Sequence, residues 1–164
     1  MVDSLKIKDI RMLVTPYSGF VEKNASIDDI AKMMIGNPSF KSVYVVDDKQ
    51  KLVGRVTLKN LIKHEFLNLI PSSFEYFNAL EFIGDKTAEG IMTTPLYVKD
   101  DDTLKTAFIK MYENNLEELP VVDKNLNLIG NIDLIELLTI LIENKEQKLN
   151  KKFLKLVINR PFHR

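Results

Sequence analysis

The sequence predicts an α/β protein built from two tandem copies of a β-α-β-β-α unit, because it contains an internal repeat. Val45-Val46-Asp47 followed by Leu52-Val53-Gly54 returns 76 residues later as Val121-Val122-Asp123 followed by Leu128-Ile129-Gly130. The helical pattern that precedes it, residues 26–34, returns at 103–111 with an offset of 77 residues. The one-residue difference falls in a loop, where such changes are tolerated.

The elements of each copy follow from capping and periodicity. Ser26 and Thr103 are expected N-caps, because their side-chain oxygens can accept hydrogen bonds from the first free N–H groups of a helix. β-branched runs separated by polar turns then predict two strands, and apolar residues at helical spacing predict a second helix. The expected strands are 42–46 and 119–122, with second strands ending near Val56 and Ile132, and the second helices run from about Leu58 to Leu69 and from about Asp133 to Lys145.

We divide the chain into four parts. Residues 5–70 are the first unit, 71–86 a connecting segment, 87–145 the second unit and 146–164 a basic tail. The apolar run 74–83 predicts a connecting helix, which covers the seam between the units or serves as a ligand lid or dimer surface. From Asn144 onward seven basic residues stand against one acidic residue, which leaves 16 basic and 22 acidic residues before it. Residues 144–164 therefore carry about +6 and the rest of the chain about −6.

Composition excludes several classes of function. The sequence has no cysteine, which removes disulfide and thiol chemistry, and no apolar run near the roughly 20 residues of a membrane-spanning helix. A charged N-terminus without an apolar stretch predicts a cytoplasmic protein. His64 and His163 lack ligand spacing, and Asp100-Asp101-Asp102 precedes a helix start without the spaced oxygens of a calcium loop. We expect neither a metal site nor catalysis, since no nucleophile or phosphate-loop motif is present.

Four segments of the second copy resemble a cystathionine-β-synthase (CBS) domain: Ile91–Val98, Thr103–Met111, Glu118–Asp123 and Leu128–Asp133. The first copy is similar, with Met12–Pro16 as its leading Thr-Pro segment and Gly54–Asn60 as its strand-to-helix turn. The resemblance covers about residues 5 to 145. It implies two units packed pseudo-symmetrically through their sheets, with two clefts between them that hold adenosine-containing ligands.

The ligand-binding turn of this family is typically Gly-x-x-Thr-x-x-Asp, in which threonine faces phosphate and aspartate binds the ribose. In the first copy Gly54 and Thr57 fit that turn, and Asn60 replaces the aspartate with a neutral hydrogen-bonding group. The resemblance brings Thr93, Thr94 and Pro95 of the other copy into this cleft. Arg55 and Lys59 flank the turn and either approach an anion or remain solvated.

The second copy departs further, because Asp133 replaces the threonine and Glu136 the aspartate. An aspartate about 4 Å from a phosphate would repel it by about 4 kcal/mol at an effective dielectric constant near 20. Asp133 is therefore better explained as the N-cap of the last helix, in a cleft that suits an uncharged nucleoside or a cationic adenosyl ligand. The resemblance adds Thr15 and Pro16 to that cleft.

These observations predict a non-catalytic sensor or regulator that binds AMP, ADP, ATP or S-adenosylmethionine. A homodimer is expected because helices 61–69 and 134–142 are more apolar than one small core requires. The alternatives are a ligand-independent dimerisation scaffold and the regulatory part of an enzyme or transporter system, and the regulated partner stays unidentified.

The basic tail is expected to be an amphipathic helix that packs on the acidic part of the chain. The zero net charge argues against a nucleic-acid-binding arm, whereas a membrane-surface helix remains an alternative.

Overall fold

The computed structural model describes residues 4–10, 19–38, 40–67 and 86–158. The first unit contains β1 (Phe20–Glu22), α1 (Ile27–Gly36), β2 (Ser42–Val46), β3 (Leu52–Thr57) and α2 (Leu58–Leu67). The second unit contains β4 (Val98–Lys99), α4 (Leu104–Glu113), β5 (Glu118–Val122), β6 (Leu128–Asp133) and α5 (Leu134–Ile158). A short 3-10 helix, η2 (Ile7–Ile10), precedes the first unit, and α3 (Ala88–Ile91) precedes the second. The predicted β-α-β-β-α order is confirmed in both copies, while the expected connecting helix lies outside the described residues.

The two sheets have the same topology. In each, the central strand pairs parallel with the first strand and antiparallel with the third, in the orders β1-β2-β3 and β4-β5-β6. The register repeats as well, because Val45 pairs with Gly54 and Val121 with Gly130. The expected N-caps are also present, since Ser26 accepts a hydrogen bond from a backbone N–H of α1 and Thr103 from one of α4.

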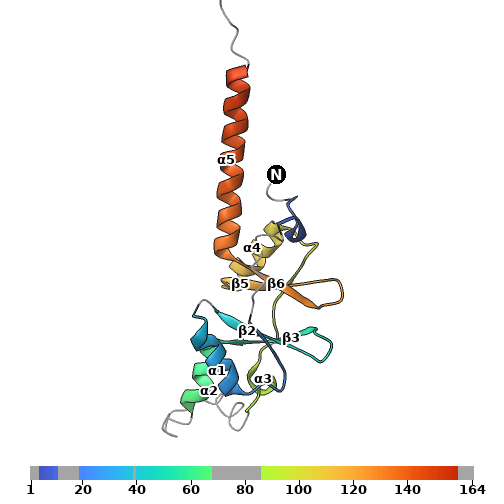
Figure 1. Ribbon diagram of the computed structural model, residues 1–164, viewed down its shortest axis with the longest axis vertical. Coiled ribbons are helices and arrows are strands. Elements are labelled where there is room, and N and C mark those ends of the chain that lie inside the picture. The colour runs from blue at the N-terminus through green and yellow to red at the C-terminus, as the bar shows by residue number, and fades with distance from the viewer. Residues whose placement is uncertain (1–3, 11–18, 39, 68–85, 159–164) are drawn as a thin grey trace, which may run out of the picture.

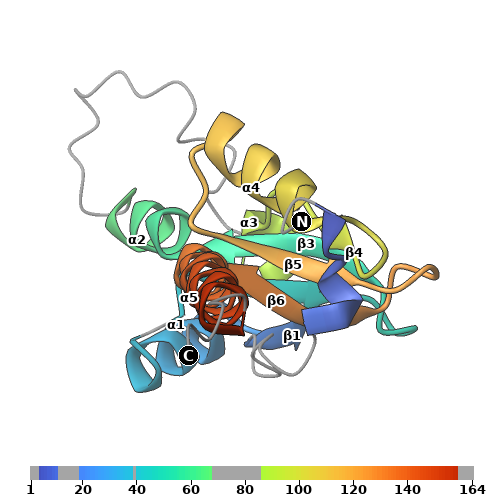
Figure 2. The same cartoon turned by 90° about the horizontal axis from the view of Figure 1, so that it is seen from above.

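The sheets face each other across the junction of the two units (Figure 1). Tyr44 and Leu52 of the first sheet form a buried cluster with Val122 of the second. The hairpin turns also join, because the Leu52 N–H donates to the Leu126 carbonyl at 3.0 Å. Figure 2 shows the same stacking from above, with β3 lying close to β5 and β6 in projection. The two units are therefore packed through their sheets, as the resemblance implies.

Each unit is completed by the segment that precedes the other unit. Ile7 of η2 belongs to the core of the second unit, whereas Ala88 and Ile91 of α3 belong to the core of the first. Backbone bonds fix both exchanges, from Ile7 N to Asp102 O at 2.9 Å and from Ala88 N to Ala25 O at 2.8 Å. The core of each unit therefore includes residues from the segment that leads into the other unit.

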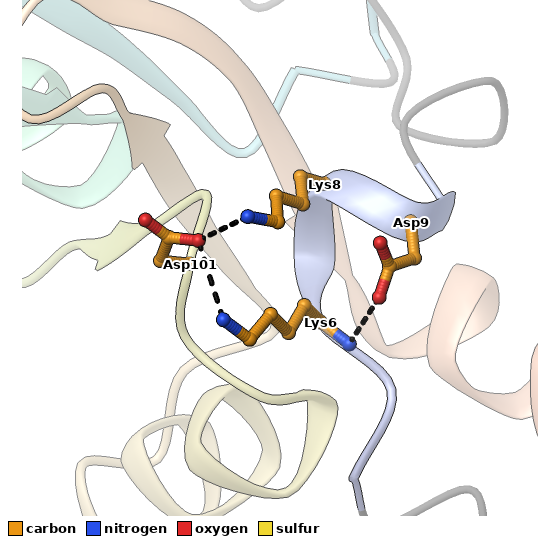
Figure 3. Close-up of polar contacts among 4 residues, drawn as sticks. All are labelled: Lys6, Lys8, Asp9 and Asp101. Atoms are coloured by element: carbon orange, nitrogen blue, oxygen red, sulfur yellow. Dashed lines mark hydrogen bonds and ion pairs between the residues drawn. The ribbon is translucent and has the colours of Figure 1, made fainter.

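Lysines hold η2 and the residue before it to the second unit (Figure 3). The Asp101 carboxylate accepts from Lys8 Nζ at 2.5 Å and from Lys6 Nζ at 3.4 Å. These pairs are exposed, so they add little to stability and mainly orient the segment. The acidic run at 100–102 thus serves local structure, because Asp102 also accepts a hydrogen bond from the Lys99 N–H at 2.9 Å.

The last helix is longer than expected. We expected it to end near Lys145, but α5 continues to Ile158 and projects away from both units (Figure 1). The sequence between these residues contains no glycine or proline, and its lysines, its glutamate and its glutamine favour a helix. The expectation that this part packs on the chain's own acidic surface is therefore wrong for residues up to 158. Among the helices described, none combines the length and hydropathy needed to span a membrane.

Candidate functional site

The first strand-to-helix turn is held by its own polar side chains. Thr57 ends β3, and its hydroxyl accepts a hydrogen bond from Asn60 N at 3.1 Å. The same hydroxyl donates to Asn60 Oδ1. Thr57 is therefore the N-cap of α2, a ten-residue helix whose free N–H groups and dipole favour an anion at this end.

The Thr-Pro segment of the second copy meets this turn. Arg55 and Thr93 exchange two backbone hydrogen bonds, each 2.9 Å long, and the Thr93 hydroxyl donates to the Arg55 carbonyl at 3.2 Å. Thr94 is exposed and Pro95 is buried. The structure thus brings Thr93 to the strand that carries Gly54 and Thr57.

Glycine is required at position 54 by this close approach. A Cβ atom at Gly54 would lie only 2.8 Å from Met92 Cγ and would overlap Met92 Sδ. The leading segment of the second copy can therefore reach β3 only because residue 54 has no side chain.

The second strand-to-helix turn forms a reciprocal cap. Glu136 N donates to Asp133 Oδ1 at 2.7 Å, and Asp133 N donates to Glu136 Oε2 at 3.0 Å. Both carboxylates thus satisfy backbone N–H groups at the start of α5, as in a capping box. The expected N-cap role of Asp133 is confirmed. Thr15 and Pro16, which we expected beside this turn, lie outside the described residues.

A buried polar cluster links the units between the two turns. Ser42 donates to Glu118 Oε1 at 2.5 Å, and both residues are at least 92% buried. They begin β2 and β5 and are 76 residues apart, so they occupy equivalent positions in the repeat. Arg55 Nε and Asn131 Oδ1 are also buried and have no hydrogen-bond partner in the described part of the chain, and the buried Tyr44 hydroxyl lies beside Ser42 and Glu118.

Burial shifts the ionisation of this cluster. It raises the pKa of Glu118 above its ordinary value of 4.5, although the bond from Ser42 and the nearby Arg55 guanidinium oppose that shift. Burial and then the charge of Glu118 raise the pKa of Tyr44, which stays protonated at neutral pH. Arg55 therefore lies near a buried carboxylate, so the reading in which it is merely solvated is wrong.

A cavity of about 280 Å³ opens beside the cluster at the start of α5. Its lining residues are Lys41, Glu117, Glu118, Asp133, Leu134 and Ile135. Three carboxylates face one ammonium group, and Lys41 is already paired with Glu117 at 3.7 Å. The cavity beside the second turn is therefore acidic, whereas the first turn carries Arg55 and Lys59.

Sequence reasoning missed Ser42, Tyr44 and Glu118. The sequence did contain a signal for them, because all three are polar residues within central strands that are otherwise apolar.

No group of three or more metal-ligating side chains occurs among the described residues, and His64 lies 3.4 Å from Glu65.

Comparison with known proteins defines the class. The CBS domain family model matches residues 7–66 and 88–143, so the chain belongs to the CBS domain family and contains a tandem pair of these domains. The crystal structure of a CBS domain-containing protein from Thermotoga maritima is similar, with 30% identity and a TM-score of 0.70 over 85% of this chain and 96% of that one.

Two further proteins are similar to this chain, one by structure and one by sequence. CBSX2 of Arabidopsis thaliana, solved in complex with AMP, is 25% identical, with a TM-score of 0.67 over 85% of this chain and 98% of that one. Protein SDS23 of Scheffersomyces stipitis is 26% identical over 126 residues, which are 74% of this chain and 22% of that protein. The chain thus spans about a fifth of the length of this curated relative.

Proposed function

We propose that this CBS pair is a non-catalytic cytoplasmic regulator that binds an adenine nucleotide in the cleft between its units, at the first strand-to-helix turn. The observation that carries the proposal is the pairing of Thr93 with Arg55, because it brings the second copy's Thr-Pro segment to the N-terminus of α2. The similarity to CBSX2, which was solved with AMP, supports the ligand class.

The charges of the two turns favour the first one for a phosphate. Lys59 lies in the first turn of α2, so its charge and the helix dipole have the same sign there. With Asn60 Oδ1 bound to Thr57, the Asn60 amide N–H groups are the part that would face a ribose hydroxyl. Replacing a carboxylate by this neutral group weakens the contact by about 1 kcal/mol, which lowers affinity without abolishing it.

The second cleft suits a different ligand. Glu117, Glu118 and Asp133 would repel a phosphate, whereas an uncharged nucleoside or the sulfonium of S-adenosylmethionine would meet a favourable potential. The two clefts of one CBS pair would then bind two different adenosyl compounds.

A ligand-independent dimerisation scaffold is the second candidate. It is favoured by the fact that the polar groups of each turn bind one another, Thr57 with Asn60 and Asp133 with Glu136. In both candidates the module is a homodimer, because α2 and α5 expose large apolar side chains. These are Leu58, Ile62, Phe66, Leu134, Ile135, Leu138, Leu141 and Ile142.

Thermal-shift measurements with AMP, ADP, ATP, adenosine and S-adenosylmethionine separate the candidates. A nucleotide at a hundred times its Kd stabilises the folded state by about 2.7 kcal/mol, which is about 5–11 °C for a chain of this size. Such a shift with at least one phosphorylated compound is the expected result. If none of the five compounds raises the melting temperature, the ligand-independent scaffold is the better-supported function. Light scattering tests the homodimer, because the mass of the monomer is 18.9 kDa.

A further inference from the structure

Helix α5 has two opposite apolar faces, and among the described residues only one of them packs in a core. Leu137 and Ile140 are 6% and 2% exposed and pack in the core of the second unit. Ile135, Leu138 and Ile142 are 75%, 56% and 47% exposed. At about 100° per residue, these three positions fall within about 60° of one another on the side of the helix opposite the buried face.

The same spacing continues along the projecting half of α5. Positions 149, 153 and 156 are Leu, Phe and Leu, and an α-helix places them in line with positions 135, 138 and 142. We call these six positions the α5 stripe. Its intervals are three, four, seven, four and three residues, so they are the same in both directions and are centred between Lys145 and Glu146.

We propose that α5 pairs antiparallel with α5 of a second copy of this chain, through the α5 stripe. The symmetric spacing brings Ile135 opposite Leu156, Leu138 opposite Phe153 and Ile142 opposite Leu149, each pair occurring twice. This gives the alternating layers of a short coiled coil, with one four-residue irregularity at its centre. The inference rests on the homodimer of the proposed function and specifies which surface forms it and in which direction.

Charge selects the antiparallel direction. Residues 145–158 contain five lysines and one glutamate, whereas residues 134–144 contain only Glu136 and Glu143 as charged residues. Antiparallel pairing lays the basic half beside the acidic half, while parallel pairing would lay two basic halves together. At the centre, Lys145 of each copy shares a layer with Glu146 of the other, and such a polar layer specifies register.

The burial of α5 determines where the second units lie in such a pair. Because the buried face of each α5 lies opposite its stripe, each second unit lies on the outer side of the pair. The projection of α5 away from its own units leaves the basic half open to the partner (Figure 1).

Cysteine cross-linking tests whether the two α5 helices are antiparallel. No disulfide can form from native residues, because the chain contains no cysteine. Ile142→Cys and Leu149→Cys chains, distinguishable by mass, are oxidised separately and as a mixture. In the antiparallel pair, two copies of position 142 lie about 10 Å apart along the axis, beyond the roughly 7 Å limit for a disulfide. A disulfide in the mixture and little in either separate sample is therefore expected. A Tyr112→Cys chain on α4 mixed with Leu149→Cys controls for chance collisions.

The remaining outcomes overturn the pairing in distinguishable ways. Disulfides in both separate samples would show parallel helices. A dimeric mass with no disulfide in any sample would refute the α5 pairing while the homodimer stands, and a monomeric mass at micromolar concentration would refute both.

Charge reversal provides a second, independent readout. Lys145→Glu should raise the dimer dissociation constant roughly fivefold or more, and Lys145→Glu with Glu146→Lys should restore it. Tighter dimerisation by the single variant, with no restoration by the double variant, would contradict the antiparallel register.

Discussion

Replacing Ser42 by alanine removes the hydroxyl that donates to the buried Glu118 carboxylate across the two units. The bond is 2.5 Å long and Glu118 is 8% exposed, so water cannot readily take the place of the donor. Hydrogen bonds to charged groups contribute about 1.5–3 kcal/mol, and we expect Ser42→Ala to lower the free energy of unfolding by that amount at pH 7. The melting temperature should fall by about 3–12 °C.

The loss should depend on pH in a defined direction. Burial raises the pKa of Glu118 above 4.5, so the folded state holds its proton more tightly than the unfolded chain does. The resulting stability is complete below pH 4.5 and is lost as the pH rises through the pKa of the folded state. The bond from Ser42 lowers this pKa, so its removal costs most at pH 7 and least near pH 4.

Urea unfolding of four proteins at pH 4 and pH 7 provides the assay: the parent, Ser42→Ala, Glu118→Gln and the double variant. Ser26→Ala is the matched control, because Ser26 caps α1 on the surface and should cost about 1 kcal/mol at both pH values. A loss below about 0.5 kcal/mol for Ser42→Ala at pH 7, with no coupling to Glu118→Gln, would refute the reasoning.

Three further substitutions test other parts of the structure. Gly54→Ala should cost about 1–3 kcal/mol in urea unfolding because of its overlap with Met92, whereas Gly36→Ala, with nothing within 4 Å of the added carbon, should be neutral or stabilising. Asp133→Ala should cost about 1 kcal/mol and Asp133→Asn much less, since asparagine is an equally good N-cap; equal losses from both would indicate that the charge matters instead. Asp101→Asn should speed hydrogen exchange of the amides that join η2 to the second unit without lowering global stability, and unchanged exchange would show that the lysine pairs do not hold this segment.

Local patterns were sufficient to predict the units. The N-caps Ser26 and Thr103 and the β-branched strands of each copy depend on neighbours in sequence, so the repeat shows them directly. The cap of α5 by Asp133 was predictable for the same reason. The end of α5 was not, because the polar run near Lys145 resembles a helix end although its residues favour continuation.

Contacts between the units could be predicted only in outline. The resemblance implied that the Thr-Pro segment of the second copy approaches the first turn, and Thr93 does pair with Arg55. The bond from Ser42 to Glu118 depends on how two sheets meet, which no local pattern encodes. Equivalent positions of a repeat meet near its pseudo-twofold axis, so polar residues at equivalent strand positions are the signal to seek in related sequences.

Calorimetric titration of turn variants tests the central claim most directly. Thr57 and Asp133 are N-caps at equivalent positions, so Asp133→Ala controls for the loss of a cap. We predict that Thr57→Ala and Asn60→Ala weaken the binding of AMP or ATP far more than Asp133→Ala, which leaves the affinity unchanged or raises it by removing a repulsive charge. Equal losses from all three substitutions, or no binding of any adenine nucleotide by the parent protein, would contradict a nucleotide site at the first turn.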